Sequence, residues 1–193
     1  MKKIVLILTA LLTLVSCGKQ EQEVDKTVTI TNSVELNTYD ADMSRYKWLY
    51  DSEPAFTEIT LEESIRIFKE KGSGILYYGY AGCPWCERAV PILNKAAKET
   101  GVTVYYINVH FQTTMEAYNE LMTYISPILE KDSEGEPVFK VPEVIAVKNG
   151  EITDHHLALV EDFKIENDDS QMSDSQKKEL EDIYLNLIQS AKD

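Results

Sequence analysis

The stretch "GYAGCPWCERAV", residues 79–90, places two cysteines two residues apart, between an aromatic apolar run and the start of a predicted helix. Three interpretations of Cys83 and Cys86 are open at this point: a redox couple, half of a metal site, or a structural disulfide. Only the first would make the chain an enzyme. The helix N-terminus favours a redox couple, because unpaired N–H groups and the helix dipole stabilise a thiolate there.

The sequence on either side alternates between strand and helix patterns. Buried strands are predicted at "ILYYGY" (75–80) and "VTVYYINV" (102–109), and "VPEVIAVKNGEITDHHLALV" (141–160) predicts two strands joined at Asn149-Gly150. Helices are predicted over about 60–72, 84–100, 113–130 and 173–192. Strands separated by helices imply parallel pairing, and the hairpin adds antiparallel strands. The predicted fold class is therefore α/β, a central mixed sheet flanked by helices.

The metal and structural interpretations of the cysteine pair are weaker. Structural zinc needs about four ligands, and the chain has no second CxxC. His155 and His156 are adjacent on a predicted strand, so they point to opposite faces and at most one could join a site; His110 has no ligand spacing to them. A disulfide that closes so short a loop gains little entropy. We expect no metal and no cofactor.

The N-terminus has the pattern of an export signal. Lys2 and Lys3 precede an apolar run over 4–15 that is too short to span a bilayer comfortably. The run ends in "LVSC", residues 14–17, which resembles the lipobox of bacterial lipoproteins. In such proteins the cysteine is lipidated and becomes the new N-terminus; the alternatives are an ordinary signal peptide or an uncleaved anchor.

This pattern predicts the domain organisation and the location. Residues 1–16 are the signal peptide, residues 17–38 a flexible tether anchored by a lipid on Cys17, and residues 39–193 one domain. The protein would then be extracytoplasmic and attached to the cell membrane through that lipid, where disulfides persist. Lipidation of Cys17 also accounts for the third cysteine and leaves Cys83 and Cys86 as a pair.

The charge of the chain limits its partners. With 193 residues and a formal net charge of −14, the chain lacks the basic surface that nucleic-acid binding requires. The negative charge would also repel acidic partners. We expect a monomer.

Two motifs together resemble the thioredoxin-like superfamily. "CPWCERAVPIL", residues 83–93, is similar to the active-site helix of that family, including the kinking proline Pro91. "VPEVIAVKNGE", residues 141–151, is similar to its second signature, in which the proline is cis. The resemblance covers roughly residues 55–190. Exported, anchored members of this kind include thioredoxin-like lipoproteins of Gram-positive bacteria, among them bacteriocin-transport accessory proteins.

The resemblance implies a thiol-disulfide oxidoreductase. Cys83 would be the nucleophile, exposed at the helix start, and Cys86 the resolving thiol. Pro142 would be cis and would present the Val141 backbone to an extended substrate strand, with Trp85 as a further substrate contact. The expected partners are exported cysteine-containing proteins and a redox partner protein. The alternatives are a non-catalytic accessory or chaperone-like lipoprotein of a secretion system, and a metal-binding lipoprotein.

The chain also departs from the family pattern. Tyr77 occupies the position where thioredoxin has a buried acid, and the interval to Pro142 is longer, which predicts a helical insertion in the 111–137 region. Glu87 follows Cys86 in the first motif, and Glu143 follows Pro142 in the second. We therefore hypothesise that their carboxylates lie near the thiols, raise the pKa of Cys83 and make the couple less oxidising.

Overall fold

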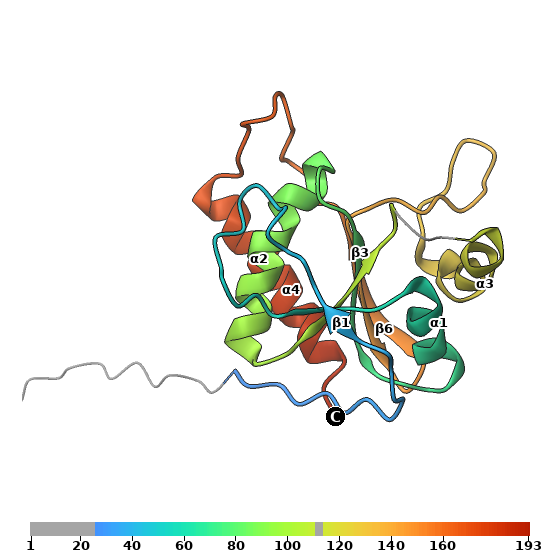
Figure 1. Ribbon diagram of the computed structural model, residues 1–193. Helices are drawn as coiled ribbons and strands as arrows, with labels where there is room; N and C mark the ends of the chain where they lie inside the picture. Colours follow the sequence, from blue (N-terminus) through green and yellow to red (C-terminus); the bar gives the residue numbers. More distant parts are fainter. Residues whose placement is uncertain (1–25, 111–113) are drawn as a thin grey trace, which may run out of the picture.

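The computed structural model describes residues 26–110 and 114–193 (Figure 1). The predicted signal peptide and Cys17 lie outside these residues. In chain order the elements are β1 (Tyr39–Asp40), β2 (Phe56–Glu58), α1 (Leu61–Lys69), β3 (Gly74–Gly79), α2 (Pro84–Thr100), β4 (Val104–Asn108), α3 (Met115–Ile125), the 3-10 helix η1 (Ser126–Ile128), β5 (Glu143–Lys148), β6 (Glu151–Leu157) and α4 (Asp174–Ser190). Within the described residues, no helix is both long and apolar enough to cross a membrane.

The strands form one mixed sheet in the order β1-β2-β4-β3-β5-β6. β4 pairs in parallel with β2 and β3, whereas β5 pairs antiparallel with β3 and β6, as the hairpin pattern predicts. Helices α2 and α4 cover one face of the sheet, and α1 and α3 cover the other (Figure 1). The central mixed sheet, the CxxC helix after β3 and the hairpin at the end make this a thioredoxin-like fold, as the sequence predicts.

Local signals set the limits of the helices. The Thr60 side chain accepts a hydrogen bond from the Glu63 N–H and so caps α1. Helix α2 begins with Pro84, which needs no N–H at a first helical position, and ends at Gly101, whose φ of 71° is the left-handed conformation of a helix stop. The helix that carries the cysteines therefore has the predicted bounds.

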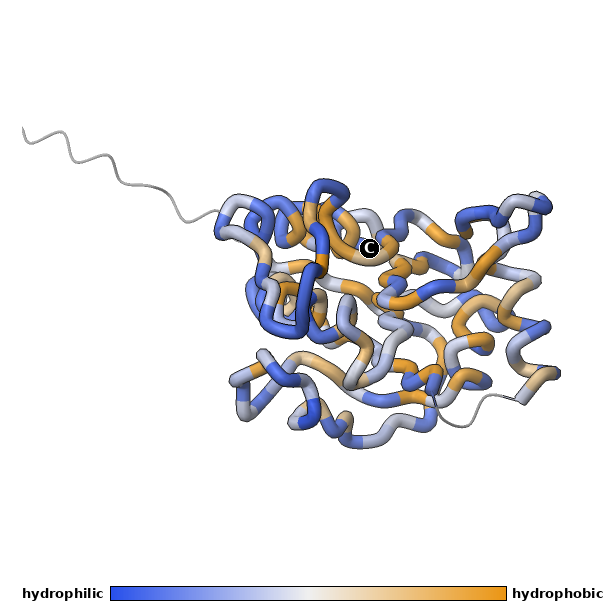
Figure 2. The backbone as a smooth tube through the Cα atoms, turned by 90° about the horizontal axis from the view of Figure 1, so that it is seen from above, coloured by the Kyte–Doolittle hydropathy of each residue, from blue (hydrophilic) through white to orange (hydrophobic). Residues whose placement is uncertain are grey.

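Alternation along β3 divides the core into two layers. Ile75 and Tyr77 face α2 and α4, whereas Leu76 and Tyr78 face α1 and α3. All four side chains are fully buried. The hydrophobic positions gather inside the molecule between the sheet and its helices (Figure 2).

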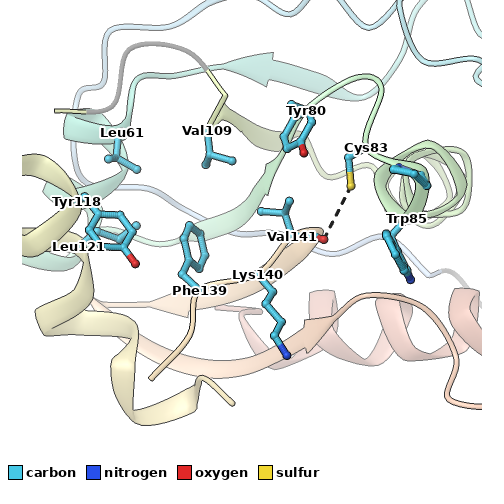
Figure 3. Close-up of a pocket in the computed structure, with 11 residues that line it drawn as sticks. Leu61, Tyr80, Cys83, Trp85, Val109, Tyr118, Leu121, Phe139, Lys140 and Val141 are labelled. Carbon is cyan, nitrogen blue, oxygen red and sulfur yellow. Dashed lines mark hydrogen bonds between the residues drawn. The ribbon is translucent and has the colours of Figure 1, made fainter. Parts of the chain in front are cut away.

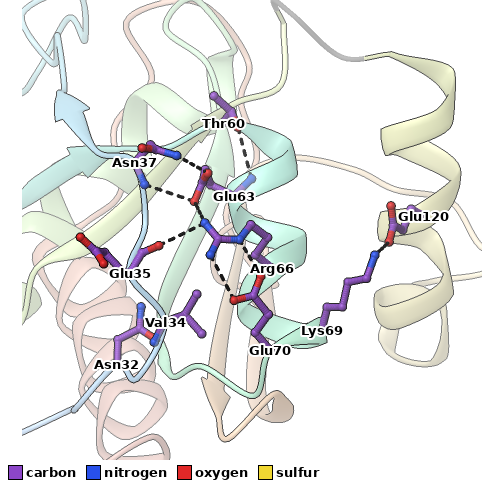
Figure 4. Close-up of polar contacts among 10 residues, drawn as sticks. All are labelled: Asn32, Val34, Glu35, Asn37, Thr60, Glu63, Arg66, Lys69, Glu70 and Glu120. Atoms are coloured by element: carbon purple, nitrogen blue, oxygen red, sulfur yellow. Dashed lines mark hydrogen bonds and ion pairs between the residues drawn. The ribbon is translucent and has the colours of Figure 1, made fainter.

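The described part of the predicted tether packs against the domain. Val28 is buried, and its N–H donates to the Thr100 carbonyl at 2.9 Å. Further along, Asn37 donates to the Glu63 carboxylate at 2.7 Å, and Arg66 donates to the Glu35 carbonyl at 3.1 Å (Figure 4). These contacts hold residues 26–38 as a strap along the domain, which differs from the flexible tether that the sequence predicts for this stretch. We call them the N-terminal strap.

Two other elements differ from the prediction. The helix predicted over 113–130 is shorter, since α3 ends at Ile125 and continues as η1 around Pro127. The segment after the strap contributes the edge strand β1 and its neighbour β2, which were not predicted, as well as Tyr46, which is 2% exposed in the core. Tyr50 in the same segment is 88% exposed. The segment is therefore buried at Tyr46 and exposed at Tyr50.

Candidate active site

Cys83 is the N-cap residue of α2. Its extended backbone (φ −73°, ψ 121°) lets its sulfur accept a hydrogen bond from the Cys86 N–H at 3.4 Å. The sulfur therefore lies at the positive end of the helix dipole, as predicted. The residue is 4% exposed, which differs from the expected exposed thiol, because the loop before β5 lies over it.

That loop brings Val141 and Pro142 to the sulfur. The Val141–Pro142 peptide bond is cis, which confirms the prediction for Pro142. The Val141 carbonyl oxygen lies 3.9 Å from the Cys83 sulfur, within reach of the thiol proton (Figure 3). The two motifs, almost sixty residues apart in the chain, thus meet at one point.

A groove with a volume of about 410 Å³ opens from Cys83. Trp85, which is 47% exposed, and Tyr80 stand at the cysteine end, and Phe139 lies along the middle (Figure 3). The far end is formed by Leu61 of α1 and by Tyr118 and Leu121 of α3. The helical insertion therefore contributes one wall of the groove.

The pKa values of the two thiols are shifted in opposite directions. The pKa of Cys83 is lowered to about 7, chiefly because the Cys86 thiol and the backbone N–H groups of Cys86 and Trp85 hydrogen-bond its thiolate. The pKa of Cys86 is raised, first by burial and then by its interaction with Cys83. Both thiols are free. The pair thus has one nucleophilic sulfur at the groove and one protonated sulfur behind it.

The hypothesis that two carboxylates raise the pKa of Cys83 holds for Glu87, as a contribution that opposes the net shift. Glu87 does raise the pKa of Cys83, but the hydrogen bonds at the helix start outweigh it. Its carboxylate accepts the Gly82 N–H at 2.6 Å and also the Lys47 N–H, so it fixes the loop before the cysteines. Glu143 is 1% exposed and bonds the His155 ring at 2.9 Å, and burial raises its pKa to about 7.

Tyr77 lies behind the buried cysteine, as its place in the sequence predicts. Its side chain is fully buried, and its hydroxyl acts on the Cys86 sulfur as a hydrogen-bonding neighbour that lowers the pKa of Cys86. The Tyr77 hydroxyl also lies 3.1 Å from the hydroxyl of Tyr46. Sequence analysis missed Tyr46 as a site residue, because the aromatic cluster over 46–50 had no spacing that tied it to the cysteines.

His155 and His156 have different neighbours, as the alternation of side chains along a strand predicts. His155 turns to Glu143, whereas His156 packs edge-to-face on Tyr184 of α4, with ring centroids 5.8 Å apart. Over residues 26–110 and 114–193 no group of three or more Cys, His, Asp or Glu side chains is arranged to hold a metal ion.

Comparison with known proteins gives matches among solved structures only. No protein-family model matches the chain. No curated protein matches it either. Among solved structures, thioredoxin from Aeropyrum pernix is 25% identical, with a TM-score of 0.37 over 52% of this chain and 73% of that chain.

Proposed function

We propose that the protein is a thiol-disulfide oxidoreductase whose working pair is Cys83 and Cys86. The observation that carries the proposal is the asymmetry of the two thiols beside an open groove. Cys83 has a pKa near neutrality and faces the groove beside Val141, whereas Cys86 is fully buried with a raised pKa. A thiolate of this kind is a competent nucleophile, because a thiol with a pKa close to ambient pH attacks disulfides best.

The chemistry is a two-step exchange. The Cys83 thiolate attacks one sulfur of a substrate disulfide, which breaks the substrate S–S bond, forms a mixed disulfide and releases one substrate thiolate. Cys86 then loses its proton and attacks the Cys83 sulfur. The second substrate thiolate leaves, and the electron pair of the dithiol has passed to the substrate. Run in reverse, the same steps oxidise a substrate dithiol.

The groove supports a polypeptide substrate. The Val141 carbonyl is at the sulfur, so an extended segment could pair with this backbone, and its apolar side chains would reach Phe139 and Leu121. Trp85 is the exposed aromatic contact at the cysteine end. Exported proteins with cysteines are the proposed substrates, and a separate redox protein would restore the pair.

The location of the protein is also a proposal. It rests on residues 1–17, with their basic start, apolar run and lipobox-like "LVSC", and it makes the protein a lipoprotein of the outer face of the cell membrane. Membrane fractionation and radiolabelled palmitate incorporation test it. Label should enter the wild-type chain, and Cys17→Ser should abolish it.

The experiment on function is a trapping one. Cys86→Ser removes the resolving thiol, so Cys83 should accumulate mixed disulfides with exported proteins, visible as bands that disappear on reduction. Cys83→Ser with Cys86 intact is the matched control and should trap nothing. If Cys86→Ser also traps nothing, and the wild type neither reduces insulin nor oxidises a dithiol substrate, the non-catalytic accessory function is favoured instead.

A further inference from the structure

The resolving cysteine is sealed from solvent, yet it must lose a proton to act. Cys86 is 0% exposed, and its thiol has a raised pKa. The groups that face it are Cys83 on its own helix, Tyr77 of β3, Tyr80 of the following loop, Tyr46 of the segment before β2, Tyr106 of β4 and Tyr184 of α4. None of them is a carboxylate. Among these groups, the proton of Cys86 can therefore pass to a tyrosine oxygen or to the Cys83 sulfur.

Three of these phenols lead away from Cys86 toward the surface. Tyr77 and Cys86 belong to one buried cluster, and hydrogen bonding by the Tyr77 hydroxyl lowers the pKa of Cys86. The same hydroxyl lies 3.1 Å from the Tyr46 hydroxyl. The Tyr46 ring stands edge-to-face on Tyr106, with ring centroids 6.2 Å apart, and the Tyr46 hydroxyl lowers the pKa of Tyr106. The ring of Tyr106 in turn stacks on Tyr77 at 5.5 Å, which holds the three side chains as one cluster.

The outer end of the cluster reaches a polar crevice. Tyr106 lines a crevice of about 70 Å³ together with Asp42, Arg45 and Glu58. Glu58 is the register partner of Tyr106 on β2, so both side chains lie on the same face of the sheet. Glu58 is half-buried, and burial raises the pKa of its carboxyl above the usual range. A carboxylate that can accept a proton thus stands where the cluster meets solvent.

The backbone of β3 has a feature that only the Tyr77 hydroxyl explains. A side chain at Gly79 would place its Cβ 2.2 Å from the Tyr77 hydroxyl oxygen. Real Cβ atoms do not approach so closely, so the glycine leaves the space into which the phenol folds. The strand thus carries a glycine two residues after Tyr77 on the same face, at the place that orients its hydroxyl.

We propose that the hydroxyls of Tyr77, Tyr46 and Tyr106 form a proton relay that connects buried Cys86 with Glu58 in the crevice. The relay rests on the proposed function, and it gives that function a further residue, Tyr77, which lies in the same buried cluster as the resolving cysteine. Tyr46 and Tyr106 act through it.

The proton balance of the relay is simple. The Cys86 proton passes to the Tyr77 oxygen while the Tyr77 proton passes to Tyr46, that of Tyr46 to Tyr106, and that of Tyr106 to Glu58. Each tyrosine ends with the one proton it began with, and Cys86 becomes the thiolate that attacks Cys83. Burial raises the pKa of all three phenols, that of Tyr106 to about 12, so they stay neutral and can both donate and accept. Reduction of the disulfide returns the proton along the same path.

The test separates formation of the mixed disulfide from its resolution. Reduced full-length protein is mixed with glutathione disulfide, quenched with acid at successive times, and the glutathione adduct on Cys83 is followed by mass spectrometry. Tyr46→Phe removes one buried oxygen that touches neither cysteine. We expect the adduct to form at the wild-type rate and to resolve about tenfold or more slowly, since positioned proton transfer is worth at least that much.

Matched variants exclude a general effect of losing a buried hydroxyl. Tyr78→Phe removes the neighbouring phenol oxygen on the opposite face of β3, where it bonds Ser64 at 3.2 Å, and should resolve the adduct at the wild-type rate. Tyr184→Phe removes the phenol of α4, which has no hydrogen-bond partner among the described residues, and should do the same. Glu58→Gln should slow resolution and remove its dependence on pH in the acid range.

Two results would overturn the relay. One is resolution in Tyr46→Phe and Glu58→Gln at the wild-type rate at every pH. The other is an equal slowing in Tyr184→Phe, which would place the proton path at α4. Glutathione disulfide needs no protein substrate, so the relay can fail while exported proteins are still trapped by Cys86→Ser, and the reverse can also occur.

Discussion

At the scale of single residues, the site depends on the difference between two sulfur atoms on one helix turn. The largest cause that lowers the pKa of Cys83 is the Cys86 thiol, so we expect removal of that donor to raise it. In the reduced wild type, alkylation of Cys83 by iodoacetamide should rise with a midpoint near pH 7. In Cys86→Ala the midpoint should move upward by about one unit, toward the ordinary thiol value. Mass spectrometry of the alkylated peptide gives both curves, and equal midpoints would contradict this cause.

The raised pKa of Glu143 leads to a prediction of how the stability of the protein depends on pH. Its pKa is raised to about 7 in the folded protein, so between about pH 4.5 and 7 the folded chain holds a proton that the unfolded chain has released. This stabilisation is complete below about pH 4.5 and is lost as the pH rises through 7. In the wild type, this group should lower the free energy of unfolding by roughly 1–3 kcal/mol as the pH rises from about 4.5 to above 7. Glutamine stays neutral at every pH, so Glu143→Gln should lack this decrease. Urea unfolding at pH 5 and pH 8 measures it; an unchanged difference would contradict it.

Some of these residue properties could be predicted from the sequence, and some could not. Cys83, Pro142 and Tyr77 lie at fixed offsets from two motifs, so their places followed from spacing. The net direction of the Cys83 pKa did not, because it depends on whether the hydrogen bonds to the sulfur outweigh burial and the charge of Glu87. Two N–H groups, of Gly82 and Lys47, hold that carboxylate, and Lys47 comes from a segment that no pattern connects to the helix.

At the scale of elements, local signals were enough for the helices and the hairpin. A cap such as Thr60 and a stop such as Gly101 act within a few residues, so they can be recognised in the sequence. The edge strand β1 and its neighbour β2 are two and three residues long and exist only through their pairing with neighbouring strands. So short a stretch carries no period, which is why the sheet was predicted without them.

A prediction at the scale of elements concerns how much the N-terminal strap contributes to stability. Val28 is 4% exposed, and its neighbour Thr29 is exposed and points to solvent. Val28→Asp would bury an unpaired charge and should lower the free energy of unfolding by about 3 kcal/mol, whereas Thr29→Asp should change it by less than about 0.5 kcal/mol. Urea denaturation of both variants measures the difference. Equal, small effects would mean that these residues are the free tether that the sequence predicted.

At the scale of the whole molecule, the fold brings three distant segments to one point. Helix α2 supplies the thiols, the loop before β5 supplies Val141, and the segment before β2 supplies Tyr46 behind them. The first two were predictable, because each carries its own motif. The third was not, since only the closed sheet places the Tyr46 hydroxyl against Tyr77. The groove wall from α3 depends on the same closure.

The central claim is that Cys83 and Cys86 exchange disulfides in two steps, and the most direct measurement is catalytic turnover. The wild type, Cys83→Ser and Cys86→Ser are compared as catalysts of exchange between reduced glutathione and a peptide disulfide. We predict many turnovers in the wild type, a stalled adduct on Cys83 in Cys86→Ser, and the uncatalysed rate in Cys83→Ser. A wild-type protein that is no faster than Cys83→Ser would contradict the claim.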